Sequence, residues 1–180
     1  MGKQYKSLTD KDREFIQAQK LFYIASSSGR EVNLSPKGYD TIRVLDKKSL
    51  VFMSYPGSGN RTYRDAVDDG EFTLVFNAFE GEPKILRLFC KAKVIESKSE
   101  KFHQYVKIFG EKEEVIRNFF EFTIYAVESS CGMTVPLMEY KSDRNGLKDW
   151  AVKMVKNGKL EAYKEGHFIP IDLKKFKTDI

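Results

Sequence analysis

Residues 54–62, Ser-Tyr-Pro-Gly-Ser-Gly-Asn-Arg-Thr, combine hydroxyl, amide and guanidinium donors with two glycines in one short segment. The segment follows the apolar run 50–53, which reads as a strand, and leads into residues 61–67, which read as a helix with Asn60 at its N-cap. Unpaired backbone N–H groups at a helix start, together with the side chain of Arg61, favour an anion such as a phosphate. The alternative is an ordinary loop that caps a short helix.

The glycine spacing separates this segment from the common nucleotide-binding motifs. A Walker loop has a Lys-Ser/Thr pair directly after its last glycine, whereas Asn60 and Arg61 follow Gly59 here. The pair Gly57 and Gly59 also lacks the third glycine of a GxGxxG fingerprint. The segment alone therefore predicts an anion site without naming the ligand.

Composition narrows the class of protein. The 180 residues carry a net charge of +5, but the lysines alternate with acids, and only residues 174–177 form a basic cluster, so we expect no nucleic-acid partner. The first residues lack the apolar stretch of a signal peptide, and no apolar run is long enough to cross a membrane. Cys90 and Cys131 are far apart in sequence and belong to no metal or redox motif. We therefore expect a cytoplasmic protein with reduced cysteines and no membrane partner.

Metal chemistry is not expected. His103 falls in a predicted surface helix and His167 near a loop, and neither has ligand spacing to a cysteine, an acid or the other histidine. Cys90 shares one face of a predicted strand with Leu86, Leu88 and other apolar residues, which predicts a small core residue.

Short strands dominate the pattern between two helical ends. Alternation and turn residues predict strands over 22–27, 31–35, 39–45, 50–54, 71–79, 84–96 and 120–131, and helices over 10–20, 61–67, 97–118 and 141–160. Trp150 lies on the apolar face of the last helix, where we expect it to anchor that helix. Closure of the strands into a small barrel would remove the exposed sheet edges.

Three stretches, residues 32–45, 57–62 and 79–88, closely resemble the pyridoxamine 5'-phosphate oxidase-related, FMN-binding split-barrel family. Residues 130–138 and 143–150 look like the same subgroup, so the resemblance covers about residues 15–165. It implies a mainly β fold with peripheral helices (α+β), an antiparallel split β-barrel of six strands or so. We expect a single domain over residues 1–180, with a C-terminal helical extension over about 141–180.

The resemblance also implies FMN at a homodimer interface, with residues 60–62 in the place of the family's Ser-Arg-Lys phosphate clamp. Thr62 departs from that clamp by replacing a cation with a hydroxyl, so a further cation is needed, and Lys37, Arg43 and Arg87 are the candidates. Donors at the edge of the flavin ring would come from Asn33, Ser35 and Ser54, which we expect on adjacent strands. The full set of expected cofactor-binding residues is Asn33, Ser35, Lys37, Arg43, Ser54, Ser58, Asn60, Arg61, Thr62 and Arg87.

Two simpler interpretations stay open for parts of this set. Asn33, Ser35 and Ser54 are also typical of ordinary strand surfaces. Arg43 and Arg87 could instead pair with acids across a dimer interface.

The function implied is that of an FMN-dependent oxidoreductase, acting on a small-molecule substrate or with a nicotinamide electron donor. No catalytic acid or base is assigned, although Tyr39, Tyr55 and Lys37 could reach a bound ring. Pyridoxamine phosphate is not the expected substrate. True pyridoxamine phosphate oxidases have an arginine-rich C-terminal segment that ends near an Arg-Leu-Ser-Pro pattern, and residues 166–176 lack it. Of the ending typical of the subgroup, only Ile171-Asp172 remain. The alternative is a carrier or sensor that binds a flavin or deazaflavin without turnover; haem is disfavoured because neither histidine suits an axial position.

Overall fold

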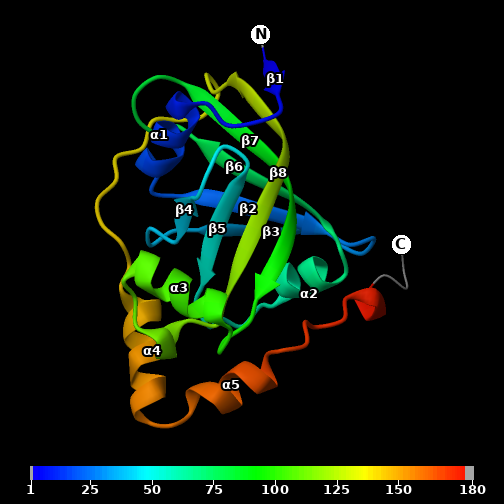
Figure 1. The fold of residues 1–180 in the computed structure, drawn as a ribbon, viewed down its shortest axis with the longest axis vertical. Helices are drawn as coiled ribbons and strands as arrows, with labels where there is room; N and C mark the ends of the chain where they lie inside the picture. Colours follow the sequence, from blue (N-terminus) through cyan, green and yellow to red (C-terminus); the bar gives the residue numbers. More distant parts are fainter. Residues whose placement is uncertain (1, 177–180) are drawn as a thin grey trace.

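The computed structural model describes residues 2–176 and contains one curled antiparallel sheet of eight strands (Figure 1). The order along the sheet is β3-β2-β6-β7-β8-β5-β4, and β1 pairs separately with β8. The split-barrel prediction is confirmed, with eight strands rather than about six. The strands are β1 (Lys3–Tyr5), β2 (Phe22–Ser27), β3 (Asn33–Lys37), β4 (Ile42–Val44), β5 (Ser49–Ser54), β6 (Glu71–Asn77), β7 (Lys84–Ile95) and β8 (Asn118–Cys131).

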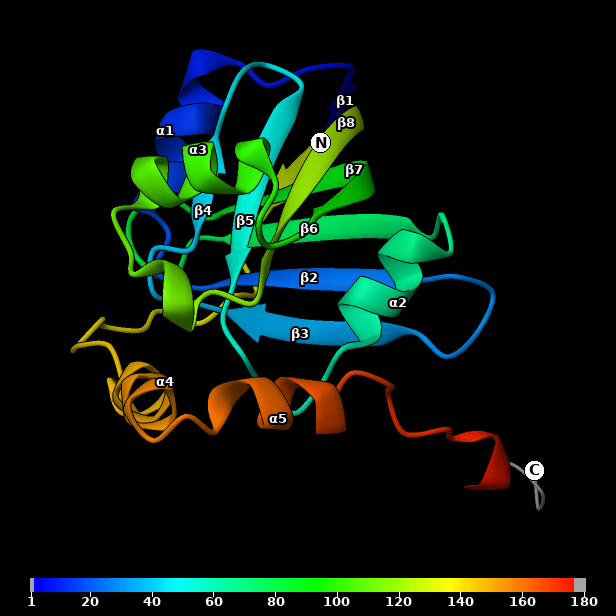
Figure 2. The ribbon, with the colours of Figure 1, turned by 60° about the horizontal axis from the view of Figure 1, so that its bottom comes forward.

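The helices surround this sheet and leave parts of its rim open. In Figure 2, α2 lies beside the ends of β2 and β3, while α4 and α5 run along the β3 side. The helices are α1 (Asp10–Ala18), α2 (Arg61–Val67), α3 (Glu100–Phe109), α4 (Gly146–Lys156) and α5 (Leu160–Gly166), with 3-10 turns at Glu113–Val115 and Lys174–Phe176.

Alternating side chains on the long strands build the core. On β7, Leu86, Leu88 and Cys90 are fully buried among the apolar residues of β2, β5, β6 and β8. Burial raises the pKa of the Cys90 thiol, which keeps it protonated and unreactive. The prediction that Cys90 is a core residue is confirmed.

The sheet curls without closing. Its path ends at β3 on one side and β4 on the other, and no ladder joins these two strands within the described residues. The predicted closure is therefore incomplete. The expectation that Asn33, Ser35 and Ser54 lie on adjacent strands is wrong, because β3 pairs with β2 whereas β5 pairs with β4 and β8.

Several boundaries differ from the sequence prediction for local reasons. The strand expected over 31–35 is displaced to 33–37 and includes Pro36, which an edge strand tolerates because it needs ladder bonds on one side only. Tyr39 and Asp40 adopt φ values of 63° and 53°, so β4 begins only at Ile42. The helix expected over 97–118 ends at Phe109, where Gly110 takes the left-handed conformation.

Two elements were not predicted. Strand β1 is only three residues long, and helix α5 follows α4 after a break at residues 157–159. By contrast, the bounds of β2 and α2 agree with the prediction.

Candidate functional site

A pocket of about 390 Å³ lies between β3, the end of β5 and the loop that precedes α2. Phe52 and Phe120 supply apolar lining, and the remaining lining is largely polar. The pocket brings together eight of the ten cofactor-binding residues expected from the sequence. These are Asn33, Ser35, Lys37, Ser54, Ser58, Asn60, Arg61 and Thr62.

The other two expected residues lie elsewhere and already have acidic partners in the same chain. Arg43 makes two hydrogen bonds of 2.7 and 2.8 Å to Asp40 and lies over the ring of Phe109. Arg87 on β7 bonds Glu128 at 3.3 Å and Ser130 at 2.8 Å. Neither residue lines the pocket.

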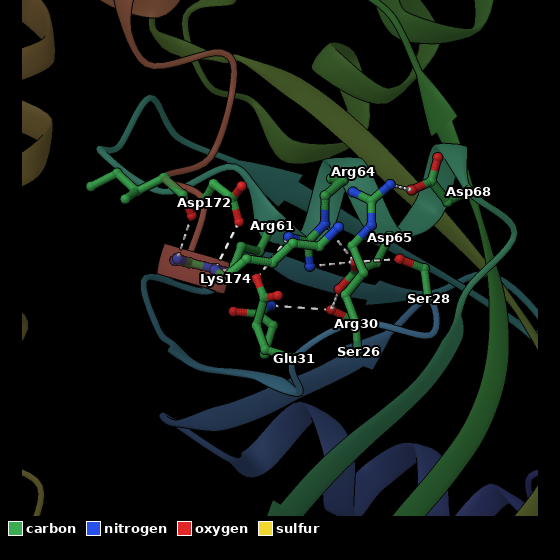
Figure 3. A network of polar contacts seen from close by, with 12 residues as sticks. Ser26, Ser28, Arg30, Glu31, Arg61, Arg64, Asp65, Asp68, Asp172 and Lys174 are labelled. Atoms are coloured by element: carbon green, nitrogen blue, oxygen red, sulfur yellow. Dashed lines mark hydrogen bonds and ion pairs between the residues drawn. The ribbon is translucent and has the colours of Figure 1, made fainter. Parts of the chain in front are cut away.

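Arg61 lines the pocket but is also paired with an acid. Its Nε donates to Oε1 of Glu31 at 3.0 Å, and its Nη2 donates to the carbonyl of Ile171 at 3.3 Å. Arg64 donates to the same Glu31 oxygen at 2.7 Å, so one carboxylate faces two guanidinium groups (Figure 3). Hydrogen bonds, chiefly from Arg64, lower the pKa of Glu31 to about 2.

Helix α2 is held against the sheet by a buried carboxylate. Asp65 is fully buried and accepts hydrogen bonds from Ser26 at 2.7 Å and Ser28 at 2.9 Å, while Arg64 pairs with it at 2.8 Å (Figure 3). This satisfied network fixes the helix that carries Arg61 relative to β2.

Asn33 links the edge strand to the helix. Its Nδ2 donates to the hydroxyl of Thr62 at 3.2 Å and to that of Ser26 at 3.1 Å. The end of the pocket near α2 is therefore built from β3 and α2 together.

Asn60 occupies the N-cap position, as predicted, but makes no side-chain capping bond. Its Nδ2 instead donates to the carbonyl of Phe168 at 2.8 Å, and the Phe168 ring packs edge-on against Tyr63 at 5.0 Å. The segment after α5 thus runs along the outside of the loop and holds it.

Arg117 is the functional candidate that the sequence analysis missed. Its two terminal nitrogens donate to the carbonyls of Gly59 at 3.0 Å and Gly57 at 2.5 Å, and Nη1 also lies 3.4 Å from Oδ1 of Asn60. Arg117 pairs with no acid in residues 2–176, and burial lowers the pKa of its guanidinium. No sequence motif includes Arg117, and the sequence predicts a helix at this position.

Lys37 is another cation in this region that pairs with no acid of residues 2–176. Its Nζ lies over the Phe52 ring, 5.6 Å from the centroid, and it forms no hydrogen bond or ion pair with the described part of the chain. Burial, with a smaller effect from the charge of Arg117, lowers the pKa of Lys37. Two uncompensated cations therefore favour an anionic ligand here.

The opposite end of the pocket carries two tyrosines. The rings of Tyr39 and Tyr55 meet edge-on at 5.8 Å, and Lys148 of α4 lies over both. The Tyr55 hydroxyl donates to Glu111, and burial with this contact raises the pKa of Tyr55. Tyr55 is therefore held as a protonated phenol.

Two kinds of feature are absent from residues 2–176. No group of three or more His, Cys, Asp and Glu side chains is arranged to hold a metal ion. No helix in this range has the length and apolar character needed to cross a membrane.

The amino-acid sequence of this chain is similar to that of a curated protein. No protein-family model matches the chain. The chain is 35% identical over 144 residues to the pyridoxamine 5'-phosphate oxidase family protein ustO of Aspergillus flavus, a match that covers 77% of this chain and 58% of that protein. The chain thus spans little more than half the length of this curated relative.

Solved structures share the fold at low sequence identity. A candidate pyridoxamine 5'-phosphate oxidase from Lactobacillus delbrueckii matches with a TM-score of 0.53 and 17% identity, covering 68% of this chain and 98% of that one. HupZ of Group A Streptococcus matches with a TM-score of 0.54 and 14% identity, covering 67% and 92%. In sequence and in fold, the chain is therefore similar to the pyridoxamine 5'-phosphate oxidase family, as its motifs predicted.

Proposed function

We propose that this chain binds FMN in the pocket between β3 and β5 and acts as a flavin-dependent oxidoreductase. The observation that carries the proposal is the convergence, in one pocket, of eight residues expected to bind this cofactor. The similarity to a pyridoxamine 5'-phosphate oxidase family protein supports it.

The residues present fit such a ligand. The pocket volume, about 390 Å³, falls within the range of about 300–1,000 Å³ typical of small-molecule sites. A Cβ at Gly57 or Gly59 would meet no protein atom within 4 Å, so the backbone there faces open space. Ser58, Arg61 and Thr62 would hold the phosphate, with Asn33 beside Thr62, and Ser35 and Ser54 would meet the polar edge of the ring.

The flavin ring, when bound, would supply hydride and electron transfer. The protein's part is to bind and orient it. Arg117 fixes the carbonyls of Gly57 and Gly59, which keeps the loop shaped for the ligand. Phe52 and Phe120 offer an apolar surface for a flat ring.

The wider assignments follow from the family resemblance. We propose a cytoplasmic homodimer of single-domain chains, with α4 and α5 as a C-terminal extension of the barrel. The substrate, the nicotinamide donor and the activity of the whole protein belong to the same proposal, because the chain spans only 58% of its curated relative.

The first experiment is the visible absorption spectrum of the purified protein, followed by release and mass identification of the chromophore. Flavin bands with the mass of FMN support the proposal, and a deazaflavin mass would replace the cofactor. A colourless protein that also fails to bind added FMN overturns the proposal. Repeated reduction by NADH or NADPH separates an enzyme from a carrier, which would bind flavin without turnover.

Arg61→Ala tests the site itself. The variant should lose most of its flavin, because a charge-assisted contact contributes about 1.5–3 kcal/mol, while Arg87→Ala, outside the pocket, should keep it. Equal flavin content in the two variants would count against the assigned pocket.

A further inference from the structure

Lys37 is a charged pocket residue whose charge the described chain leaves unbalanced. Within residues 2–176, its side chain interacts only with the face of Phe52 and with the positive charge of Arg117, which itself has no acidic partner in that range. Arg61 differs, because Glu31 neutralises it at 3.0 Å. Among these cations, Lys37 would therefore stabilise a negatively charged group of a ligand most strongly.

The strand β3 places Lys37 away from the α2 end of the pocket. Asn33 pairs with Ser26 and contacts Thr62, whereas Lys37 pairs with Phe22 at the other end of the strand. Four residues at about 3.3 Å each separate their backbones by about 13 Å. Residues 33, 35 and 37 share one face, so polar side chains run along the pocket from end to end.

The surroundings of Lys37 suit the flat end of a ligand. Phe52 and Phe120 stack with centroids 6.0 Å apart and an interplanar angle of 23°, and both line the pocket. A cation that lies over these aromatic rings loses part of its hydration free energy. A negatively charged ligand group placed beside it would offset that cost.

We propose that Lys37 stabilises negative charge on the ring of the bound flavin, and that residues 58–62 hold the phosphate at the other end. The inference rests on the proposed function. The oxidised ring is neutral, whereas a ring that has gained two electrons and one proton carries one negative charge. Lys37 should therefore strengthen binding of the reduced ring more than binding of the oxidised ring.

The measurable consequence is a shift in reduction potential, because the potential of a bound cofactor reports the ratio of its affinities in the two oxidation states. For a two-electron couple, a tenfold change in that ratio is about 30 mV. A side chain that only supports the fold would weaken both forms equally and leave the potential unchanged.

The test compares three variants loaded with FMN. Dithionite reduces each protein together with a reference dye, and the dissociation constant of oxidised FMN is measured separately. Lys37→Met should lower the preference for the reduced form about tenfold, Lys37→Arg should stay within threefold of the parent, and the control Lys93→Met, on the exposed part of β7 outside the pocket, should not change it.

Each outcome decides the matter. A Lys37→Met protein that binds FMN with the parent potential overturns the inference and leaves the proposed function intact. An equal loss of affinity for both oxidation states also overturns it. If the parent chain binds no flavin, the proposed function fails and the inference fails with it.

Discussion

Arg61 donates from Nε to Oε1 of Glu31 at 3.0 Å, so the arginine that matches the family's phosphate clamp has a carboxylate partner within its own chain. Glu31 belongs to the connection between β2 and β3 and also pairs with Arg64 at 2.7 Å. An anion that binds Arg61 must therefore share the guanidinium with Glu31 or displace it. This competition weakens the contribution of Arg61 to anion binding.

Glu31→Gln should strengthen FMN binding. Removing the carboxylate charge leaves Arg61 free to pair with phosphate, which we expect to tighten the dissociation constant about three- to tenfold, or about 1 kcal/mol. A titration that follows the quenching of flavin fluorescence measures this dissociation constant. Asp68→Asn, which removes an ion pair with Arg30 at 3.2 Å outside the pocket, is the matched control. Equal affinities for Glu31→Gln and the parent would show that Glu31 does not compete.

Because of Glu31, the free energy of unfolding should decrease at acidic pH. Because the folded pKa of Glu31, about 2, lies below its ordinary value of 4.5, the contribution of Glu31 is complete above pH 4.5 and is lost as pH falls toward 2. Urea unfolding of the parent should show this loss across that interval, and the Glu31→Gln protein should show a shallower fall. Parallel curves for the two proteins would contradict the assignment.

Arg117→Met should open the loop at Gly57 and Gly59. The lost hydrogen bonds are partly offset because a half-buried cation disappears, so we expect about 1–2 kcal/mol of lost stability and about tenfold weaker FMN binding. Denaturant unfolding and flavin titration measure the two effects. Arg117→Lys keeps the charge without the planar fork; full recovery by lysine would mean that charge alone, and not the two carbonyl contacts, matters.

Trp150→Ala should destabilise the fold without removing the ligand. Trp150 is half-buried, packs against Tyr163 at 4.7 Å and borders a cluster of buried apolar residues that includes Phe102 and Phe119. Because it stays partly exposed, we expect about 2 kcal/mol, less than the roughly 3–5 kcal/mol of a fully buried aromatic residue. Trp150 does not line the pocket, so FMN affinity of the folded variant should match the parent. Loss of flavin at unchanged stability would assign Trp150 to the site.

The strongest local patterns predicted structure well. The run 22–27 alternates buried and half-buried residues as a strand on a core should, and its bounds were correct. Helix α2 was located from an apolar strand, a glycine-rich loop and the composition that follows. Family resemblance added the split form of the barrel and the grouping of residues 57–62 with β3, which no local pattern could show.

The sequence is least informative where long-range contacts determine the partner of a side chain. Arg117 contacts Gly59 and Gly57, which are 58 and 60 residues away in the sequence, so no spacing in the sequence indicates its role. Arg43 and Arg87 were candidates because they lie off the core face, but alternation cannot tell whether a nearby acid will take the charge. Asn60 has the right type for a cap, yet the carbonyl of Phe168 takes its amide instead.

Pro36 has a consequence for how copies of this protein meet one another. Strand β3 ends the sheet, and Leu34 on this strand and Val32 just before it are exposed. Such an edge allows a strand from another molecule to pair with it and start aggregation. Pro36 offers no N–H to such an incoming strand, and Lys37 next to it carries a charge. Pro36 and Lys37, which line the pocket, thus also disfavour the pairing of β3 with a strand of another molecule.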